Sequence, residues 1–419
     1  MTALFEPLTL PNGSVLSNRL CKAAMEENLS EEGQLPGTAL ETLYRQWSAG
    51  GVGLILTGNV MIAPNALTGP GGVVLQKGQA LESFKRWSAA AKSGGAAVWM
   101  QLNHPGRQVY ASMGEQAFAP SPIGVSIAGF DSLFPQPRAL EHDEILKIIQ
   151  RFADSALLAE QSGFDGCQIH AAHGYLISQF LSPLTNQRDD QWGGNLENRA
   201  RILFEVVKAI NTNVSNGFCV SIKLNSADFQ KGGFDQNDAR WVVEQLNSMN
   251  VDLVELSGGS YESPAMQGYV PKDKASKDST GEREVYFIDF ARAIASTATM
   301  PIMVTGGIRK RDVAISALER DEKGFGVKML GIGRAMAFVP DLPSAWQQGE
   351  KLNVVLPSVN WKNKTLAALA VMAITKAQLR RLSKGQSPNI NMSPVLTVVS
   401  DRLRTFLKTK RYRRWRKGA

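Results

Sequence analysis

Eight short apolar runs alternate with longer amphipathic stretches along most of the chain. The runs lie at residues 18–24, 53–58, 97–101, 166–170, 219–223, 253–257, 302–305 and 329–332. Apolar residues recur with helical spacing at 143–161, 195–211 and 238–249, and each of these stretches starts on a polar or acidic residue. The alternation predicts βα units around a parallel sheet. Eight such units predict an α/β fold, the (β/α)8 TIM barrel.

Polar residues and glycines follow the predicted strands at their C-terminal ends. They are Glu26, Gly58, Gln101, His104, His170, His173, Lys223, Ser257, Gly306 and Arg334. Barrel enzymes build their active sites on that face, so we expect a site there. The segment 106–141, rich in Pro, Ser and Gly, follows the third strand and predicts a lid or substrate wall rather than a simple surface insertion.

Three candidate catalytic side chains lie close together in the motif His170-Ala-Ala-His173-Gly-Tyr175. Two neutral imidazoles three residues apart can donate N–H groups to one substrate oxygen, and a nearby phenol can deliver a proton. The spacing alone leaves three interpretations open: a carbonyl-polarising pair, a structural pair and a metal site.

Glycines after the last two strands predict a phosphate site. Thr305-Gly306-Gly307 and Gly331-Ile-Gly333-Arg334 each place bare backbone N–H groups where an anion can approach, and the arginine adds charge. Strands seven and eight carry such a site in many barrels.

Segment 163–201 resembles the old yellow enzyme family of FMN-dependent ene-reductases, also called NADH:flavin oxidoreductases. The motif above, Phe180-Leu-Ser-Pro183 and Gly193-Gly-Asn-Leu-Glu-Asn-Arg199 carry the resemblance, which extends over about residues 3–345. It implies that NADH or NADPH reduces FMN, which passes hydride to the β-carbon of an activated alkene (enone, enal or nitroalkene). His170 and His173 would hold the alkene's oxygen, and Tyr175 would protonate the α-carbon.

The resemblance also implies the cofactor contacts. Gln101 would form hydrogen bonds with the flavin pyrimidine edge, and Lys223 would favour the anionic reduced flavin. The phosphate would be bound by Gly306, Gly307, Gly333 and Arg334. Ala24, Met25, Glu26 and Gly58 complete the expected FMN-binding set. Glu26 departs from the family, which has threonine or cysteine there. Its charge would disfavour reduced flavin unless burial keeps the carboxyl protonated or the side chain turns away.

Cysteines and hydropathy limit the other possibilities. Cys21, Cys167 and Cys219 are far apart, which excludes a disulfide framework and an iron–sulfur cluster, so we expect the form of the family that lacks such a cluster and a second nucleotide-binding domain. The N-terminus has no signal-peptide pattern and no run of 18 apolar residues occurs, which predicts a cytoplasmic protein.

Charge divides the chain into a predicted catalytic domain, 1–350, and a basic C-terminal extension, 351–419. The extension has 16 Lys and Arg against one acid, Asp401, or +15; the remainder has 46 − 16 = 30 bases and 38 − 1 = 37 acids, or −7. An apolar stretch at 365–374 predicts a helix packed on the barrel or lying at a membrane surface. Phe406, Tyr412 and Trp415 among the later bases suit an anionic lipid surface, whereas docking on the acidic body is the alternative. No nucleic-acid partner is expected.

Two functions of other classes remain open at this point. One is a metal-dependent barrel hydrolase that uses His170 and His173, and the other is a catalytically idle barrel whose extension binds a membrane or a partner.

Overall fold

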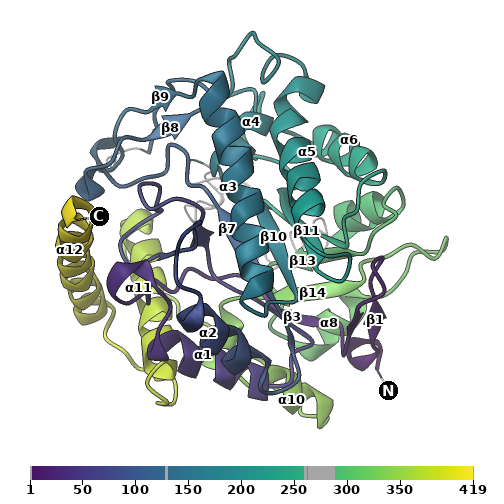
Figure 1. Cartoon of the computed structure of the whole chain (residues 1–419). Coiled ribbons are helices and arrows are strands. Elements are labelled where there is room, and N and C mark those ends of the chain that lie inside the picture. The colour runs from purple at the N-terminus through teal and green to yellow at the C-terminus, as the bar shows by residue number, and fades with distance from the viewer. Residues whose placement is uncertain (1, 128–130, 259–261, 263–287, 419) are drawn as a thin grey trace.

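The computed structural model describes residues 2–127, 131–258, 262 and 288–418. Eight parallel strands close a barrel, so the predicted TIM barrel is confirmed (Figure 1). In order around the barrel they are β3 (Leu20–Lys22), β4 (Leu54–Leu56), β7 (Ala97–Asn103), β10 (Gly166–Ala171), β11 (Cys219–Asn225), β12 (Leu253–Ser257), β13 (Ile302–Thr305) and β14 (Met329–Ile332). Strand β14 pairs with β3, which closes the ring, and all eight predicted runs are barrel strands.

Helices cover the outside of the barrel. They are α1 (Thr38–Ala49), α2 (Glu82–Lys92), α3 (His142–Gln161), α4 (Leu176–Leu181), α5 (Leu196–Asn213), α6 (Gln236–Leu246), α8 (Arg311–Ala317), α9 (Ala335–Phe338) and α10 (Leu342–Gln347). The three predicted helices are confirmed as α3, α5 and α6. Helix α6 starts two residues earlier than predicted because Asp235, not Asp238, caps it: the Asp235 carboxylate accepts hydrogen bonds from the backbone N–H groups of Asn237 and Asp238.

Two apolar cores hold these layers together. The larger core lies between the strands and the helices. The smaller one fills the lower barrel with alternate strand residues, among them Leu54, Trp99 and Met303. A hairpin of β1 (Leu8–Thr9) and β2 (Val15–Leu16) closes this end, since Leu8 and Leu16 belong to the same core. The opposite end, where the strands finish, is therefore the barrel mouth.

Several short strands and 3-10 turns lie in the loops around the mouth. Strands β5 (Val60–Met61) and β6 (Val73–Val74) extend the sheet beside β7, and β8 (Phe118–Ala119) pairs with β9 (Arg138–Ala139) within the long segment 106–141. In the described part of the chain, 3-10 turns also lie at η2 (Glu32–Gln34), η3 (Ala111–Met113) and η4 (Asp131–Leu133), while η1 (Ala3–Phe5) precedes the β1–β2 hairpin.

The C-terminal extension forms two helices, α11 (Lys364–Leu382) and α12 (Pro394–Gly418), on one side of the barrel. Figure 1 shows α12, in yellow, at the left edge with α11 between it and the barrel. Ile374 and Leu379 of α11 join the larger core, and Tyr412 of α12 is fully buried against Met61, Leu67 and Met113. Among the described helices, none is long and apolar enough to cross a membrane.

Candidate active site at the barrel mouth

His170, His173 and Tyr175 gather at the end of β10. The His170 ring lies 5.1 Å from that of His173 and 4.8 Å from that of Tyr175, centroid to centroid, and both pairs meet edge to face. Strand β10 ends at Ala171, so the chain turns immediately and brings the later two rings back over the first. The sequence motif therefore forms one compact cluster.

Both imidazoles are held in the neutral form. Burial lowers the pKa of His173 to about 3 and that of His170 well below its usual value, and the nearby Lys223 charge acts in the same direction on both. Nδ1 of His170 accepts the Ala172 N–H at 3.2 Å, so the proton of the neutral ring lies on Nε2. His170 can thus donate a hydrogen bond without carrying a charge.

His173 is fixed in an unusual backbone conformation. Its φ angle is 60°, a left-handed value that costs a non-glycine residue about 1 kcal/mol. The Asn225 Oδ1 atom accepts the His173 N–H at 3.0 Å, and Gln108 Nε2 donates to the His173 carbonyl at 3.0 Å. Nε2 of the ring lies 2.7 Å from the Ser257 hydroxyl. Strands β11 and β12 and one loop thus fix this residue, although only the histidine itself is evident from the motif.

A buried chain of polar side chains crosses the barrel beneath the cluster. Gln101 Nε2 donates to Gln168 Oε1 at 2.7 Å, Gln168 Nε2 donates to Glu255 Oε2 at 2.9 Å, and the other oxygen of Glu255 pairs with Lys223 Nζ at 2.7 Å. This chain links Gln101 on β7 to Lys223 on β11. Gln168 and Glu255, which connect them, are not evident from the sequence.

The predicted phosphate site fits a phosphate group. A Cβ atom built on Gly306 or Gly333 would meet no atom within 4 Å, so open space lies in front of both. Gly307 has a φ of 65°, which favours glycine. Burial lowers the pKa of Arg334, and the charge of Arg309 lowers it further, so the two arginines lie near each other. Neither has an ion pair in the described part of the chain, and an anion would relieve their repulsion. Arg309 is not evident from the sequence, because it lies four residues beyond the end of β13.

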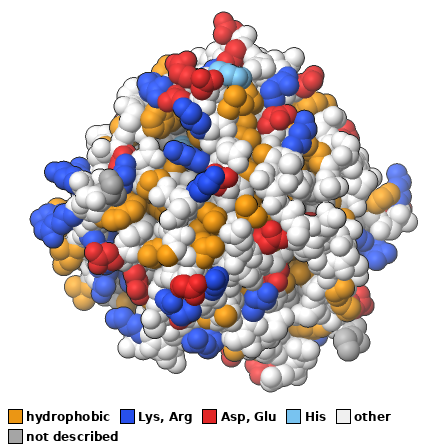
Figure 2. Space-filling view, in the orientation of Figure 1, with side chains coloured by type: hydrophobic (Ala, Val, Ile, Leu, Met, Phe, Trp, Pro, Cys, Tyr) orange, Lys and Arg blue, Asp and Glu red, His pale blue; other side chains and the backbone are white. Residues whose placement is uncertain are grey.

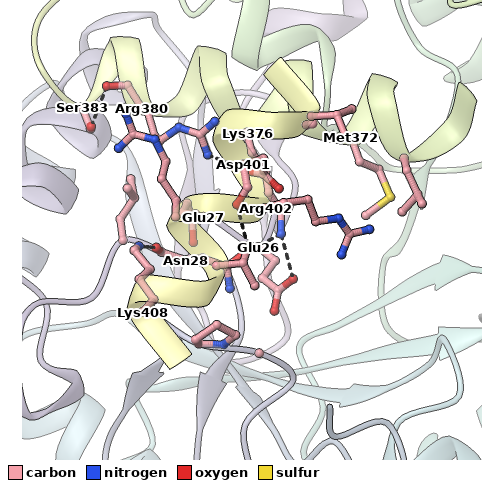
Figure 3. Close-up of a pocket in the computed structure, with 18 of the residues that line it drawn as sticks. Glu26, Glu27, Asn28, Met372, Lys376, Arg380, Ser383, Asp401, Arg402 and Lys408 are labelled. Atoms are coloured by element: carbon pink, nitrogen blue, oxygen red, sulfur yellow. Dashed lines mark hydrogen bonds and ion pairs between the residues drawn. The ribbon is translucent and has the colours of Figure 1, made fainter. Parts of the chain in front are cut away.

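The residues after β3 are arranged differently from what the resemblance implies for a flavin contact. The Glu26 carboxylate accepts a hydrogen bond from the Thr68 hydroxyl and lies 3.8 Å from Lys376 Nζ of α11 (Figure 3). Met25 packs on the larger core and Ala24 on the smaller one. Whether these three residues contact FMN stays a prediction.

Gly58 has a packing role as well as its predicted one. A Cβ at this position would lie 2.0 Å from a Glu27 carboxylate oxygen and 2.2 Å from the Met25 carbonyl. Its N–H donates to the Tyr44 hydroxyl, which donates to Glu27 at 2.6 Å. Glu27 in turn pairs with Lys22, whose side chain is fully buried, at 3.4 Å. Only glycine fits between these groups.

Comparison with known proteins decides between the remaining interpretations. The family model described as NADH:flavin oxidoreductase / NADH oxidase matches residues 3–353. The chain belongs to this family. It is therefore an NAD(P)H-dependent flavin oxidoreductase of the old yellow enzyme type that uses FMN. Among the described residues, no group of three or more His, Cys, Asp or Glu side chains is placed to hold a metal ion.

Similar proteins cover most of the chain. The NADH-dependent flavin oxidoreductase iliE of Hypocrea jecorina is 36% identical over 356 residues, which are 80% of this chain and 87% of the relative. The NADH-dependent flavin oxidoreductase iccE of Talaromyces variabilis is 34% identical, over 86% of this chain and 89% of the relative. A morphinone reductase variant in complex with tetrahydroNAD has a TM-score of 0.67 at 25% identity, over 84% of this chain and 92% of that one.

Proposed function

We propose that the enzyme reduces activated alkenes, such as enones, enals and nitroalkenes, and that His170, His173 and Tyr175 carry the chemistry on the substrate side. The observation that supports this most directly is the cluster of two neutral imidazoles and a phenol at the end of β10. Neutral donors can bind a carbonyl or nitro oxygen and stabilise the charge that develops there, a contribution of roughly 3 to 4 kcal/mol for a single donor.

The three side chains divide the work. His170 donates from Nε2, because its Nδ1 accepts the Ala172 N–H. His173 donates from a ring oriented by Ser257, and a substrate oxygen would share or displace that contact. Tyr175, 4% exposed, lies against the His170 ring and donates the proton to the α-carbon. Bound FMN supplies the hydride, which it receives from NADH or NADPH.

The residues that would hold FMN lie around the same mouth. Gln101 and Lys223 face it from β7 and β11, and Gly306, Gly307, Gly333 and Arg334 follow β13 and β14. Glu255 offsets part of the Lys223 charge through their 2.7 Å ion pair. Lys223 therefore favours an anionic reduced flavin less than an unpaired cation would.

Two half-reactions test the division of labour. Under anaerobic conditions NADH should bleach the flavin of the wild type and of Tyr175→Phe equally, whereas the variant should reoxidise much more slowly with an enone. His170→Ala and His173→Ala should weaken binding of a phenol, an oxygen ligand that is not reduced. Equal alkene turnover by wild type and Tyr175→Phe would contradict the assigned proton donor.

A second element of the proposal concerns α12 and an anionic membrane surface. Apolar side chains at helical spacing stay exposed on this helix, with Leu396 at 71%, Leu403 at 59% and Phe406 at 55% exposure. Exposed bases, including Arg413 and Arg414, accompany them, and Figure 2 shows Lys and Arg side chains at the left margin where α12 lies. An apolar stripe with adjacent cations suits the surface of anionic lipid.

Vesicle co-sedimentation tests this element on the full chain. The wild type should pellet with vesicles of phosphatidylserine and phosphatidylcholine at low salt but not with phosphatidylcholine alone. The double variant Leu403→Gln/Phe406→Gln should lose most of that binding, and Val355→Gln, an exposed apolar residue outside α12, should not. Equal pelleting by all three proteins would contradict a role for the stripe.

A further inference from the structure

A solvent-connected cavity of about 340 Å³ lies between the barrel mouth and the C-terminal helices; we refer to it as the rim cavity. Its barrel side consists of residues 26–29 after β3, Gly69 and Pro70 after β5, and Tyr110 after β7. Helices α11 and α12 supply the opposite wall, as Figure 3 shows. The rim cavity is thus formed only when the extension is docked.

The lining of the rim cavity is rich in positive charge. Six bases line it against three acids, and the bases are Lys376, Arg380, Lys384, Arg402, Arg404 and Lys408. The acids already have partners: Glu26 pairs with Lys376, Asp401 pairs with Arg380 at 2.9 Å, and Glu27 pairs with Lys22. Within the described part of the chain, Lys384, Arg402, Arg404 and Lys408 have no carboxylate partner.

The unpaired cations are crowded. Lys408 donates to the Asn28 carbonyl, and burial followed by the charges of Arg380, Lys376, Arg404 and Arg411 lowers its pKa to about 8. An anion in the rim cavity would relieve this repulsion. Arg402 is close enough to Tyr110 for its charge to lower the phenol's pKa against the larger effect of burial. Arg402 and Tyr110 both line the rim cavity, Arg402 from α12 and Tyr110 from the barrel side.

The position of the rim cavity indicates which anion it receives. Around the barrel, the order β13–β14–β3–β4–β7–β10 places the loops after β3 and β7 between the FMN phosphate site on β13 and β14 and the histidines on β10. A nicotinamide ring has to reach the mouth, and the rim cavity lies beside the mouth, at the loops that follow β3, β5 and β7. The FMN phosphate already has its own arginines, Arg309 and Arg334.

We propose that the rim cavity binds the diphosphate portion of the nicotinamide dinucleotide, with Arg402 as its main charged contact and the C-terminal helices as part of the NADH site. The extension then acts as a specificity element for the intact dinucleotide. A reductant that consists of the nicotinamide ring alone needs no such contact.

Stopped-flow reduction of the FMN-loaded enzyme tests the proposal. Arg402→Ala should raise the Kd for NADH about tenfold, the weight of one charge-assisted hydrogen bond, and leave the limiting rate of flavin reduction unchanged. The same variant should react normally with 1-benzyl-1,4-dihydronicotinamide, which has no phosphate. Arg414→Ala is the matched control, because this exposed arginine of α12 does not line the rim cavity.

Competition adds an independent readout. Inorganic pyrophosphate and ADP should compete with NADH in the wild type and compete several-fold more weakly in Arg402→Ala. An equal loss with both reductants would overturn the proposal, because the arginine would then act on the flavin or the fold. An effect confined to the KM of a carboxylate-bearing alkene, with NADH unaffected, would also overturn it and assign the cavity to the substrate.

Discussion

The neutrality of the buried imidazoles can be tested by acid titration of stability. His173 has a pKa of about 3 in the folded protein, whereas an unfolded histidine titrates near 6.5. Between these values the unfolded chain binds a proton that the folded chain does not, so stability is present above pH 6.5 and is lost as the pH falls toward 3. At pH 5 the loss relative to pH 7.5 is about 2 kcal/mol for one such ring.

Burial lowers the pKa of His104 to about 3 as well, so His104 causes a second loss of stability at low pH. Together the two rings remove about 4 kcal/mol at pH 5, a large part of the stability of an ordinary domain. Burial raises the pKa of Asp228, so protonation of this carboxyl as the pH falls favours the folded state and offsets part of the histidine effect. The test therefore compares the pH dependence of the free energy of unfolding between variants, rather than interpreting its total value in the wild type.

His173→Asn keeps a hydrogen-bond donor but removes the titrating group. Urea unfolding of the FMN-loaded protein at pH 7.5 and pH 5 should show a loss about 2 kcal/mol smaller in the variant than in the wild type. Tyr175→Phe is the control from the same cluster, because a phenol ordinarily titrates near pH 10, and it should lose as much as the wild type. A difference below about 0.5 kcal/mol between His173→Asn and wild type would refute the neutral-imidazole argument.

Four further substitutions test the FMN contacts, the role of Glu26 and the docking of the C-terminal extension. Arg334→Ala should weaken FMN binding, measured by flavin release on dilution, whereas Lys223→Met should retain flavin and lower its reduction potential; unchanged values in both would contradict their roles. Glu26→Thr should raise the flavin potential in a xanthine oxidase titration, and an unchanged potential would mean that the carboxylate serves Thr68 and Lys376 instead. Tyr412→Ala should cost about 3 to 5 kcal/mol of α12 docking and expose the helix to trypsin, and wild-type protease resistance would show that other contacts suffice.

The barrel could be predicted because its strands are buried on both faces. Strands such as Leu54–Leu56 and Met329–Ile332 are buried at every position, which produces the short apolar runs that mark them in the sequence. The histidine cluster could be predicted for a different reason: its three side chains lie within six residues of each other, so a local motif contains the whole geometry.

The partners of that cluster could not be predicted. Gln168 and Glu255 are single polar residues inside apolar strands, and they meet only because the barrel closes. The sequence also could not show whether the extension docks on the barrel, because α12 buries Tyr412 on one side and exposes Leu403 on another. Its apolar residues therefore follow no single stripe that would identify the docked face.

The contacts of α12 have a consequence for the order in which the molecule assembles. Tyr412 donates to the Pro64 carbonyl and Arg416 binds Glu115, across 348 and 301 residues of sequence. The family match ends at residue 353, and at about 5–20 residues per second the 419 − 353 = 66 residues that follow take several seconds to synthesise. During that interval the eight strands are complete while one wall of the mouth is still missing. The nascent barrel is therefore more open to FMN than the protein with α12 docked.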